Sequence, residues 1–136
     1  EYNAGSFSCT YIPSVPILID GTVSDNISLT DKRISAKRIY KAASILGLNS
    51  NDSVGINYKI INFGDELTEK ERNQIAMARA LASPDKFIFY DDFNPLVDKE
   101  IIKIFFDELK KENRIIFLST NLQENDLPKF SKLEIT

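Results

Sequence analysis

The chain has 136 residues, a formal net charge of −3, 43% hydrophobic and 27% charged residues, which together suit one globular domain with its own core. The acidic balance argues against a nucleic-acid partner, which needs a basic face, and the absence of histidine excludes any imidazole base or ligand. The single Cys9 cannot form an internal disulfide, and no apolar run reaches the roughly 18 residues of a membrane span, so we expect no direct insertion into a membrane.

The N-terminal part of the chain predicts a lead-in, an extended loop and a helix. Residues 1–10 are small and polar, and we expect them to be poorly fixed. Pro13 and Pro16 predict that residues 11–23 are extended and loop-like and do not form a regular central strand. Residues 31–48 predict a helix that stops at Gly47. The apolar positions at helical spacing are Ile39, Ala42, Ala43 and Leu46.

The C-terminal part predicts a strand–helix–strand unit preceded by a second helix. That helix covers residues 68–82 and ends before Pro84. The unbroken apolar runs Phe87–Tyr90 and Ile115–Leu118 are typical of strands buried on both faces of a parallel sheet. Residues 98–112 between them predict an amphipathic helix, and residues 132–135 predict a last short strand. The apolar stripe of the helix is Ile101, Ile102, Phe105, Phe106 and Leu109. The fold class is therefore α/β, with two helices inserted before the Phe87 strand.

Polar residues follow both predicted strands of the sheet. Asp91 and Asp92 come directly after the first strand, and residues 119–121, Ser-Thr-Asn, follow the second. Ligands of open parallel sheets bind outside the carboxyl ends of the strands. An acidic pair there is suited to a hydrated Mg²⁺, which takes few protein carboxylates and keeps its waters. The alternative is that the two aspartates only end a strand and begin a turn.

Four segments, in this order, resemble the exporter-type nucleotide-binding domain of ABC transporters. "YIPSVPILIDGTVSDNISL" is similar to the Q-loop segment, which starts Tyr-Val-Pro-Gln and ends Asn-Ile, and "GDELTEKERNQIAMARAL" to the signature segment, Leu-Ser-Gly-Gly-Gln followed by a helix ending Ala-Arg-Ala-Leu. "SPDKFIFYDDFNPLVD" resembles the Walker B strand with its Asp-Glu and D-loop, and "NRIIFLSTN" the switch strand that ends Thr-His. One such segment is a weak signal, and four in order cover nearly the whole chain.

The resemblance implies a partial P-loop-NTPase-like parallel sheet core with an inserted ABC-type helical subdomain. Residues 1–136 are then an incomplete ABC ATPase domain, with the Q-loop and helical subdomain at 15–83 and the Walker B to switch-strand core at 84–136. No G-x-x-x-x-G-K-[ST] phosphate loop occurs in the sequence. We expect that loop to lie upstream in a longer protein. The family implies ATP and Mg²⁺ as cofactors, and we expect this chain alone to bind neither.

The departures from the family pattern affect the expected catalytic positions. Ser14 stands at the Q-loop glutamine position, and it is too short to reach the metal and the attacking water. Asp92 stands at the catalytic glutamate position and is shorter by one methylene, which would misplace that water. Asn121 stands at the switch histidine position and cannot become positively charged. Asp91, the expected Mg²⁺ contact, and Asp98, the D-loop aspartate, match the family pattern.

The signature segment is the most altered of the four. The family presents a serine hydroxyl and bare glycine N–H groups to the γ-phosphate of ATP at a helix N-terminus. Here Thr68, Glu69, Lys70 and Glu71 occupy those positions. Thr-x-x-Glu is also a capping box, in which Glu71 bonds the backbone at the start of its own helix. The segment is therefore either a nucleotide contact that Lys70 partly preserves or a self-capped helix end.

Three interpretations remain open. In the first, the chain is a degenerate ATP-binding domain that energises an exporter from the cytoplasmic side of a membrane, the inner membrane in a bacterium. It would dock on a transmembrane domain through residues 14–26, and on a second nucleotide-binding domain through residues 68–71 and Asp98. In the second, the chain is a pseudo-ATPase fragment that acts as an interaction or regulatory module. In the third, it is an unrelated α/β binding domain.

Overall fold

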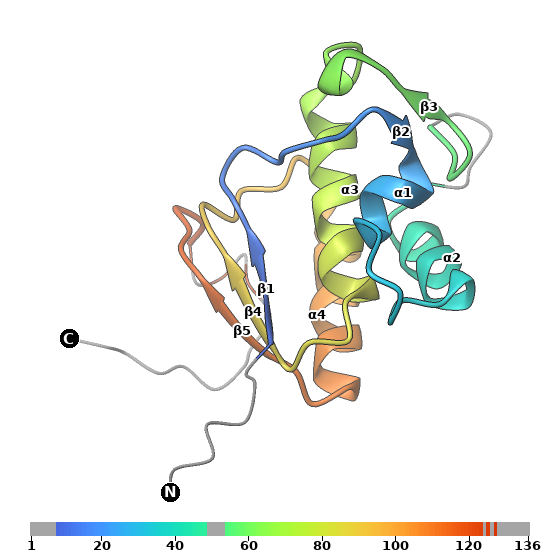
Figure 1. Cartoon of the computed structure of the whole chain (residues 1–136). Helices are drawn as coiled ribbons and strands as arrows, with labels where there is room; N and C mark the ends of the chain where they lie inside the picture. The colour runs from blue at the N-terminus through green and yellow to red at the C-terminus, as the bar shows by residue number, and fades with distance from the viewer. Residues whose placement is uncertain (1–7, 49–53, 124, 126, 128–136) are drawn as a thin grey trace, which may run out of the picture.

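The computed structural model describes residues 8–48, 54–123, 125 and 127. Ten short elements follow one another in this part of the chain, and Figure 1 shows the sheet on one side and most of the helices on the other. The elements in order are β1 Cys9–Ile12, β2 Gly21–Thr22, α1 Val23–Ser28, α2 Ala36–Ile45, β3 Lys59–Ile60, the 3-10 turn Asn62–Gly64, α3 Glu69–Ala82, β4 Phe87–Tyr90, α4 Lys99–Lys111 and β5 Ile115–Leu118.

The main sheet has three parallel strands in the order β1-β4-β5. The predicted strands β4 and β5 are confirmed, and so is the helix between them. The prediction that residues 9 and 10 belong to a poorly fixed lead-in was wrong, because Cys9–Ile12 form a strand in register with β4. This strand lies at the edge of the sheet, which agrees with the prediction that the segment from Tyr11 onward is not a central strand. Pro13 comes directly after the strand. Proline has no backbone N–H, so the strand ends there. Because the proline lies beyond the last paired residue of an edge strand, no hydrogen bond within the sheet is lost.

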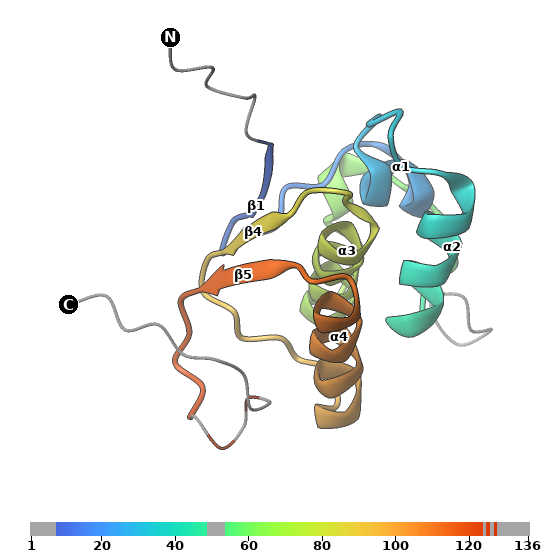
Figure 2. The same cartoon turned by 90° about the horizontal axis from the view of Figure 1, so that it is seen from below.

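The prediction that both faces of the sheet are buried was also wrong for the described residues. Helices α3 and α4 cover one face, and the views in Figures 1 and 2 agree that the other face carries no helix. Ile88 and Tyr90 are buried on the covered face. On the open face, Tyr11, Phe89 and Phe117 lie in register and are 60%, 40% and 38% exposed. An apolar run predicts a strand, but it does not tell which face has a neighbour.

The helices match the sequence prediction where local signals mark their ends. Helix α3 begins after the cap Thr68, as predicted, and α4 lies within the predicted residues 98–112 and is one residue shorter at each end. Helix α2 is shorter than residues 31–48, because Ser35 caps it through the backbone N–H of Arg38. The six-residue α1, capped by Thr22, was not predicted. The strand predicted at residues 132–135 lies outside the described residues.

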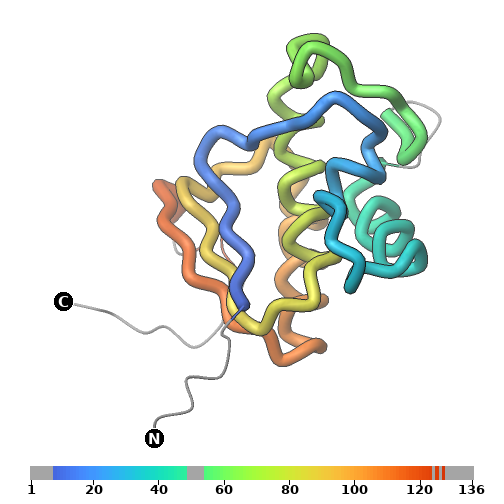
Figure 3. Tube along the Cα trace, in the orientation of Figure 1, coloured from blue at the N-terminus to red at the C-terminus, as the bar shows by residue number. Residues whose placement is uncertain are grey.

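The helices α1 and α2 pack on α3 beside the small antiparallel pair β2–β3, as the trace in Figure 3 shows. The loop before α3 meets the loop before β2 at Gly64, which has φ +79°. A Cβ there would lie 2.6 Å from Leu18 Cδ1, so glycine permits this contact. Among the described helices, none is both long and apolar enough to cross a membrane.

Candidate functional site

Four of the predicted site residues follow the same edge of the sheet. Ile12, Tyr90 and Leu118 pair across the three strands, and they are the last residues of β1, β4 and β5. Because the strands are parallel, Ser14, Asp91, Asp92 and Asn121 all come just beyond their carboxyl ends. All four are exposed. This is the edge at which open parallel sheets bind ligands.

The acidic turn after β4 is joined to the end of β5 by Ser119. The Ser119 hydroxyl donates to Asp91 Oδ1 at 2.9 Å and accepts from the backbone N–H of Asp92 at 2.8 Å. The backbone N–H of Phe93 donates to the carbonyl oxygen of Ser119 at 2.7 Å. From the other neighbouring strand, the hydroxyl of Tyr11 donates to Asp91 Oδ2 at 3.4 Å. The Asp91 carboxylate thus has a short hydrogen bond from Ser119, which follows β5, and a longer one from Tyr11 in β1.

The Asp91 carboxylate has the exposure and the free lone pairs that a ligand of a hydrated Mg²⁺ needs. It is an exposed carboxylate at the strand ends, and each of its oxygens keeps a lone pair beyond the hydroxyl that it accepts from. In the described part of the chain, no group of three or more His, Cys, Asp or Glu side chains is placed to hold a metal. Mg²⁺ typically takes one or two carboxylates and completes its shell with water and phosphate oxygens. Asp91 would therefore be one ligand in a shell made largely by other groups.

The N-terminus of α3 is closed by its own side chains, which confirms the predicted capping box. The Thr68 hydroxyl accepts from the backbone N–H of Glu71 at 3.2 Å, and the Glu71 carboxylate accepts from the backbone N–H of Thr68 at 2.7 Å. Glu69 and Lys70 are exposed in the same turn. The turn therefore presents carboxylates where a phosphate would need N–H groups, so these residues do not fit a γ-phosphate.

The remaining predicted site residue, Asp98, is the N-cap of α4. It is exposed, and its side chain makes no capping hydrogen bond. Within the described residues, no hydrogen bond or ion pair connects Asp98 or the Thr68–Glu71 turn with Asp91 or Asp92. The structure thus brings four of the residues to the sheet edge, and the other five lie at the N-terminal ends of α3 and α4.

A buried contact joins the end of the Q-loop-like segment to α3. The guanidinium of Arg79 donates to the carbonyl oxygen and to Oδ1 of Asn26, at 2.5 and 3.2 Å. Asn26 Oδ1 also accepts from the backbone N–H of Ile19 at 2.8 Å. Burial lowers the pKa of Arg79 to about 10, so the side chain keeps its charge at neutral pH. The contact fixes α1, and through Asn26 the segment before it, against the last turn of α3.

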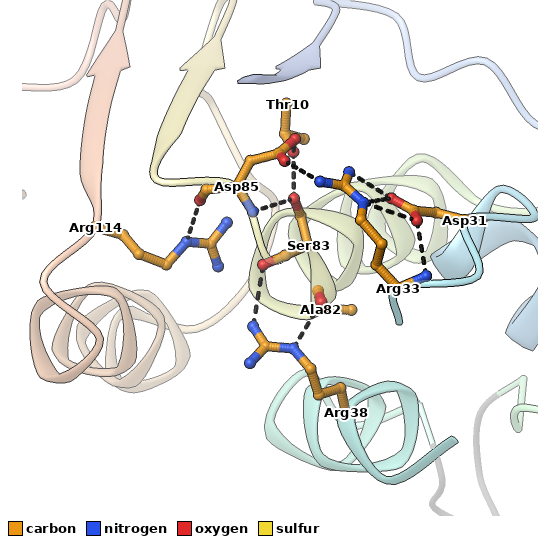
Figure 4. A network of polar contacts seen from close by, with 8 residues as sticks. All are labelled: Thr10, Asp31, Arg33, Arg38, Ala82, Ser83, Asp85 and Arg114. Atoms are coloured by element: carbon orange, nitrogen blue, oxygen red, sulfur yellow. Dashed lines mark hydrogen bonds and ion pairs between the residues drawn. The ribbon is translucent and has the colours of Figure 1, made fainter. Parts of the chain in front are cut away.

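The opposite end of the sheet holds a polar network that the sequence analysis missed. Figure 4 shows Asp85 between residues of β1, the loop before α2 and the end of α3. Its carboxylate accepts from Thr10 at 2.9 Å and from Arg33 at 3.0 Å. Burial alone raises the pKa of Asp85, but hydrogen bonds from Ser8, Thr10 and Arg33 outweigh it, so the pKa lies below its ordinary value. No local pattern marks such contacts, since they join residues more than 50 positions apart.

Two arginines in this network hold the C-terminus of α3. Arg38 donates to the carbonyl oxygens of Ala82 and Ser83 at 2.9 and 3.0 Å. Arg114 donates to the carbonyl oxygens of Leu81 and Asp85 at 3.3 and 2.9 Å. Cations at the last carbonyls of a helix satisfy unpaired acceptors and interact favourably with the helix dipole. Helix α3 is therefore secured at both ends.

Comparison with known proteins finds relatives among ABC transporters. The chain is 30% identical over 98 residues to the toxin RTX-III translocation ATP-binding protein of Actinobacillus pleuropneumoniae, covering 70% of this chain and 14% of that protein. It is 34% identical over 88 residues to YheH of Bacillus subtilis, a probable multidrug resistance ABC transporter ATP-binding/permease protein, covering 62% of this chain and 13% of that one. It is 29% identical over 103 residues to the methionine import ATP-binding protein MetN 1 of Burkholderia orbicola, covering 76% and 29%.

These matches show that the chain is a distant homologue of part of the ATP-binding domain of ABC transporters, exporters and importers alike. It spans less than a third of the length of the three relatives named. No family model matches the chain. A solved bacterial Atm1-family ABC exporter with ATP bound superposes with a TM-score of 0.71 at 16% identity, over 86% of this chain and 21% of that one. This likeness establishes the α/β fold and confirms the predicted fold class.

Proposed function

We propose that this chain is the C-terminal part of the ATP-binding domain of an exporter-type ABC transporter, with weak or absent ATP hydrolysis of its own. In this proposal, residues 15–83 are the Q-loop and helical subdomain, and residues 84–136 are the core from Walker B to the switch strand. The domain lies on the cytoplasmic side of a membrane, the inner membrane in a bacterium. It energises transport together with a transmembrane domain and a second nucleotide-binding domain.

The observation that carries the proposal is the meeting of three motif-bearing segments at one edge of the sheet. Asp91 and Asp92 follow β4 beside residues 119–121, which follow β5, and Ser14 follows β1 at the same edge. A carboxylate at Asp91 suits an Mg²⁺ that is bound mainly by nucleotide phosphates and water. Asp92 and Asn121 replace the groups that would orient and polarise an attacking water, so this edge supports positioning more than catalysis.

The expected docking surface for the transmembrane domain has an unusual apolar character. Val15, Ile17 and Phe63 are 72%, 71% and 70% exposed. Their loops are adjacent, because Asp20 accepts a hydrogen bond from the backbone N–H of Phe63 at 2.8 Å. Exposed apolar groups gathered on two adjacent loops are typical of a protein-binding surface. We propose that residues 14–26, with Phe63, contact the transmembrane domain.

A second candidate function is a pseudo-ATPase module that binds proteins and has given up nucleotide. The capping box favours it, because Glu71 occupies the helix end that would receive a γ-phosphate from the partner site. Both candidates use the same docking surfaces. They differ in whether any longer form of the protein binds Mg-ATP.

Calorimetric titration with Mg-ATP separates the two candidates. The titration uses this 136-residue chain and a longer natural form that includes the residues N-terminal to Glu1. The transporter proposal expects binding by the longer form and none by this chain. Binding by neither form supports the pseudo-ATPase module. Micromolar binding by this chain alone would contradict the view that the phosphate-binding groups lie outside it.

A further inference from the structure

Ser119 connects the ends of β4 and β5 through four hydrogen bonds. Its backbone N–H donates to the carbonyl oxygen of Tyr90 at 3.1 Å, and its carbonyl oxygen accepts from Phe93. Its hydroxyl reaches the Asp91 carboxylate at 2.9 Å and the backbone N–H of Asp92 at 2.8 Å. One exposed residue thus contacts every residue from 90 to 93.

The hydroxyl of Ser119 is the part of these contacts that depends on the side chain. Asp92 has φ +50°, a left-handed conformation that costs a non-glycine residue about 1 kcal/mol or more unless other contacts hold it. The Oγ atom of Ser119 is the acceptor for the Asp92 N–H, and the same atom donates to Asp91 Oδ1. An alanine at position 119 would leave the backbone pairing intact and remove both hydroxyl contacts.

Apart from Ser119, the Asp91 carboxylate has one weaker hydrogen-bond donor among the described residues, the hydroxyl of Tyr11. The Tyr11 hydroxyl donates to the other carboxylate oxygen at 3.4 Å, which is long for an O–H···O hydrogen bond. Asp91 is exposed, so without Ser119 its side chain would sample several rotamers. The direction of its carboxylate relative to the strand ends is therefore set mainly by Ser119.

We propose that Ser119 is a positioning residue, whose hydroxyl fixes the Asp91 carboxylate and the left-handed backbone of Asp92 in one arrangement. The part of this proposal that concerns the conformation of Asp91 and Asp92 follows from contacts within the chain. The part that concerns Mg²⁺ binding by Asp91 rests on the proposed function. Threonine at position 119 keeps the hydroxyl and should preserve this role, since the position is exposed.

The test compares isotope-labelled full chains by NMR, with Ser119→Ala, Ser119→Thr and a control, Ser44→Ala, on an exposed position of α2. The first measurement is hydrogen exchange at the Asp92 amide. We expect Ser119→Ala to speed this exchange about fivefold to tenfold relative to wild type, in line with one lost hydrogen bond. Ser119→Thr should restore the wild-type rate, and Ser44→Ala should leave it unchanged. An unchanged rate in Ser119→Ala overturns the proposal.

The second measurement is the broadening of signals from residues 90–93 by Mn²⁺, used as a paramagnetic probe in place of Mg²⁺. We expect broadening in wild type and Ser119→Thr, at least twofold weaker broadening in Ser119→Ala, and none in Asp91→Asn. Equal broadening in wild type and Ser119→Ala overturns the role of Ser119 toward a metal. If no variant shows broadening while exchange at Asp92 still responds, the positioning role is supported and the assignment of Asp91 to Mg²⁺ fails.

Discussion

The guanidinium of Arg79 and the backbone carbonyl of Asn26, 53 residues apart, form a buried hydrogen bond of 2.5 Å between α3 and α1. Arg79 has no carboxylate partner among the described residues and is held by oxygen atoms of Asn26. At the position that resembles the Arg of the family's Ala-Arg-Ala-Leu sequence, Arg79 therefore makes structural contacts within the chain. It ties the segment proposed to dock on a membrane partner to the helix that carries the signature-like turn.

Replacing Arg79 by Leu should reduce the free energy of unfolding by about 3 kcal/mol, because buried acceptors of Asn26 lose a charged donor. Urea denaturation followed by circular dichroism measures this change. Lys37→Leu on the exposed face of α2 is the control, for which we expect a change of less than about 0.5 kcal/mol. Equal effects of the two substitutions would show that the Arg79–Asn26 contact adds little to stability.

Replacing Thr68 by Ala should reduce the free energy of unfolding by about 1 kcal/mol, the typical effect of losing a helix N-cap. The substitution removes the acceptor for the Glu71 N–H and half of the capping box. Thr68→Ser keeps the hydroxyl and should stay within about 0.5 kcal/mol of wild type. If alanine and serine are equally tolerated, the self-capped turn does not stabilise α3.

The Asp85 network should make the protein sensitive to acid. The pKa of Asp85 in the folded chain lies below the ordinary value of 3.8. Its ionised form therefore contributes stability that is complete above pH 3.8 and is lost as the pH falls through the lower, folded-state pKa. Asp85→Asn should flatten this loss, measured as the free energy of unfolding between pH 5 and pH 2, that is, over about three pH units around the ordinary carboxyl pKa.

Asp25, Asp31 and Glu108 also have lowered pKa values, so Asp85→Asn should remove only part of the acid effect. Asp20→Asn, which changes an exposed-loop carboxylate that bonds the backbone of Phe63, is the comparison. An acid profile of Asp85→Asn that matches wild type would mean that the network does not depend on the charge of Asp85.

Phe63 combines an exposed side chain with a left-handed backbone at φ +55°. Glycine removes this strain, so Phe63→Gly should raise the free energy of unfolding by about 0.5–1 kcal/mol, because little buried surface is lost. Phe63→Ala keeps the backbone strain and should be less stable than Phe63→Gly. Thermal unfolding of the three proteins gives the order. Destabilisation by both substitutions would show that the Phe63 ring packs in the folded chain and does not serve a partner.

The sequence by itself determined the elements whose signals are local. The apolar stripe of residues 101–109 defined α4, and Thr-x-x-Glu defined the start of α3 together with its capping hydrogen bonds. The β-branched and aromatic runs defined β4 and β5. These signals work because a helix cap, a helical stripe and a strand run each involve residues within a few positions of one another. The strand–helix–strand order of these elements gave the fold class, and the four motif-like segments added the resemblance to an ABC-type ATPase domain.

Only the tertiary structure decided what depends on contacts between distant residues. Cys9–Ile12 lacks an unbroken apolar run and precedes a proline, and it is a strand because β4 supplies its hydrogen bonds, 78 positions later in the chain. Ser119 looked like one residue of a polar strand end, and its role emerged from a turn that lies 27 residues before it. Which face of the sheet is open likewise depends on where α3 and α4 pack. The apolar sequence of a strand is the same whether one face or both faces are covered.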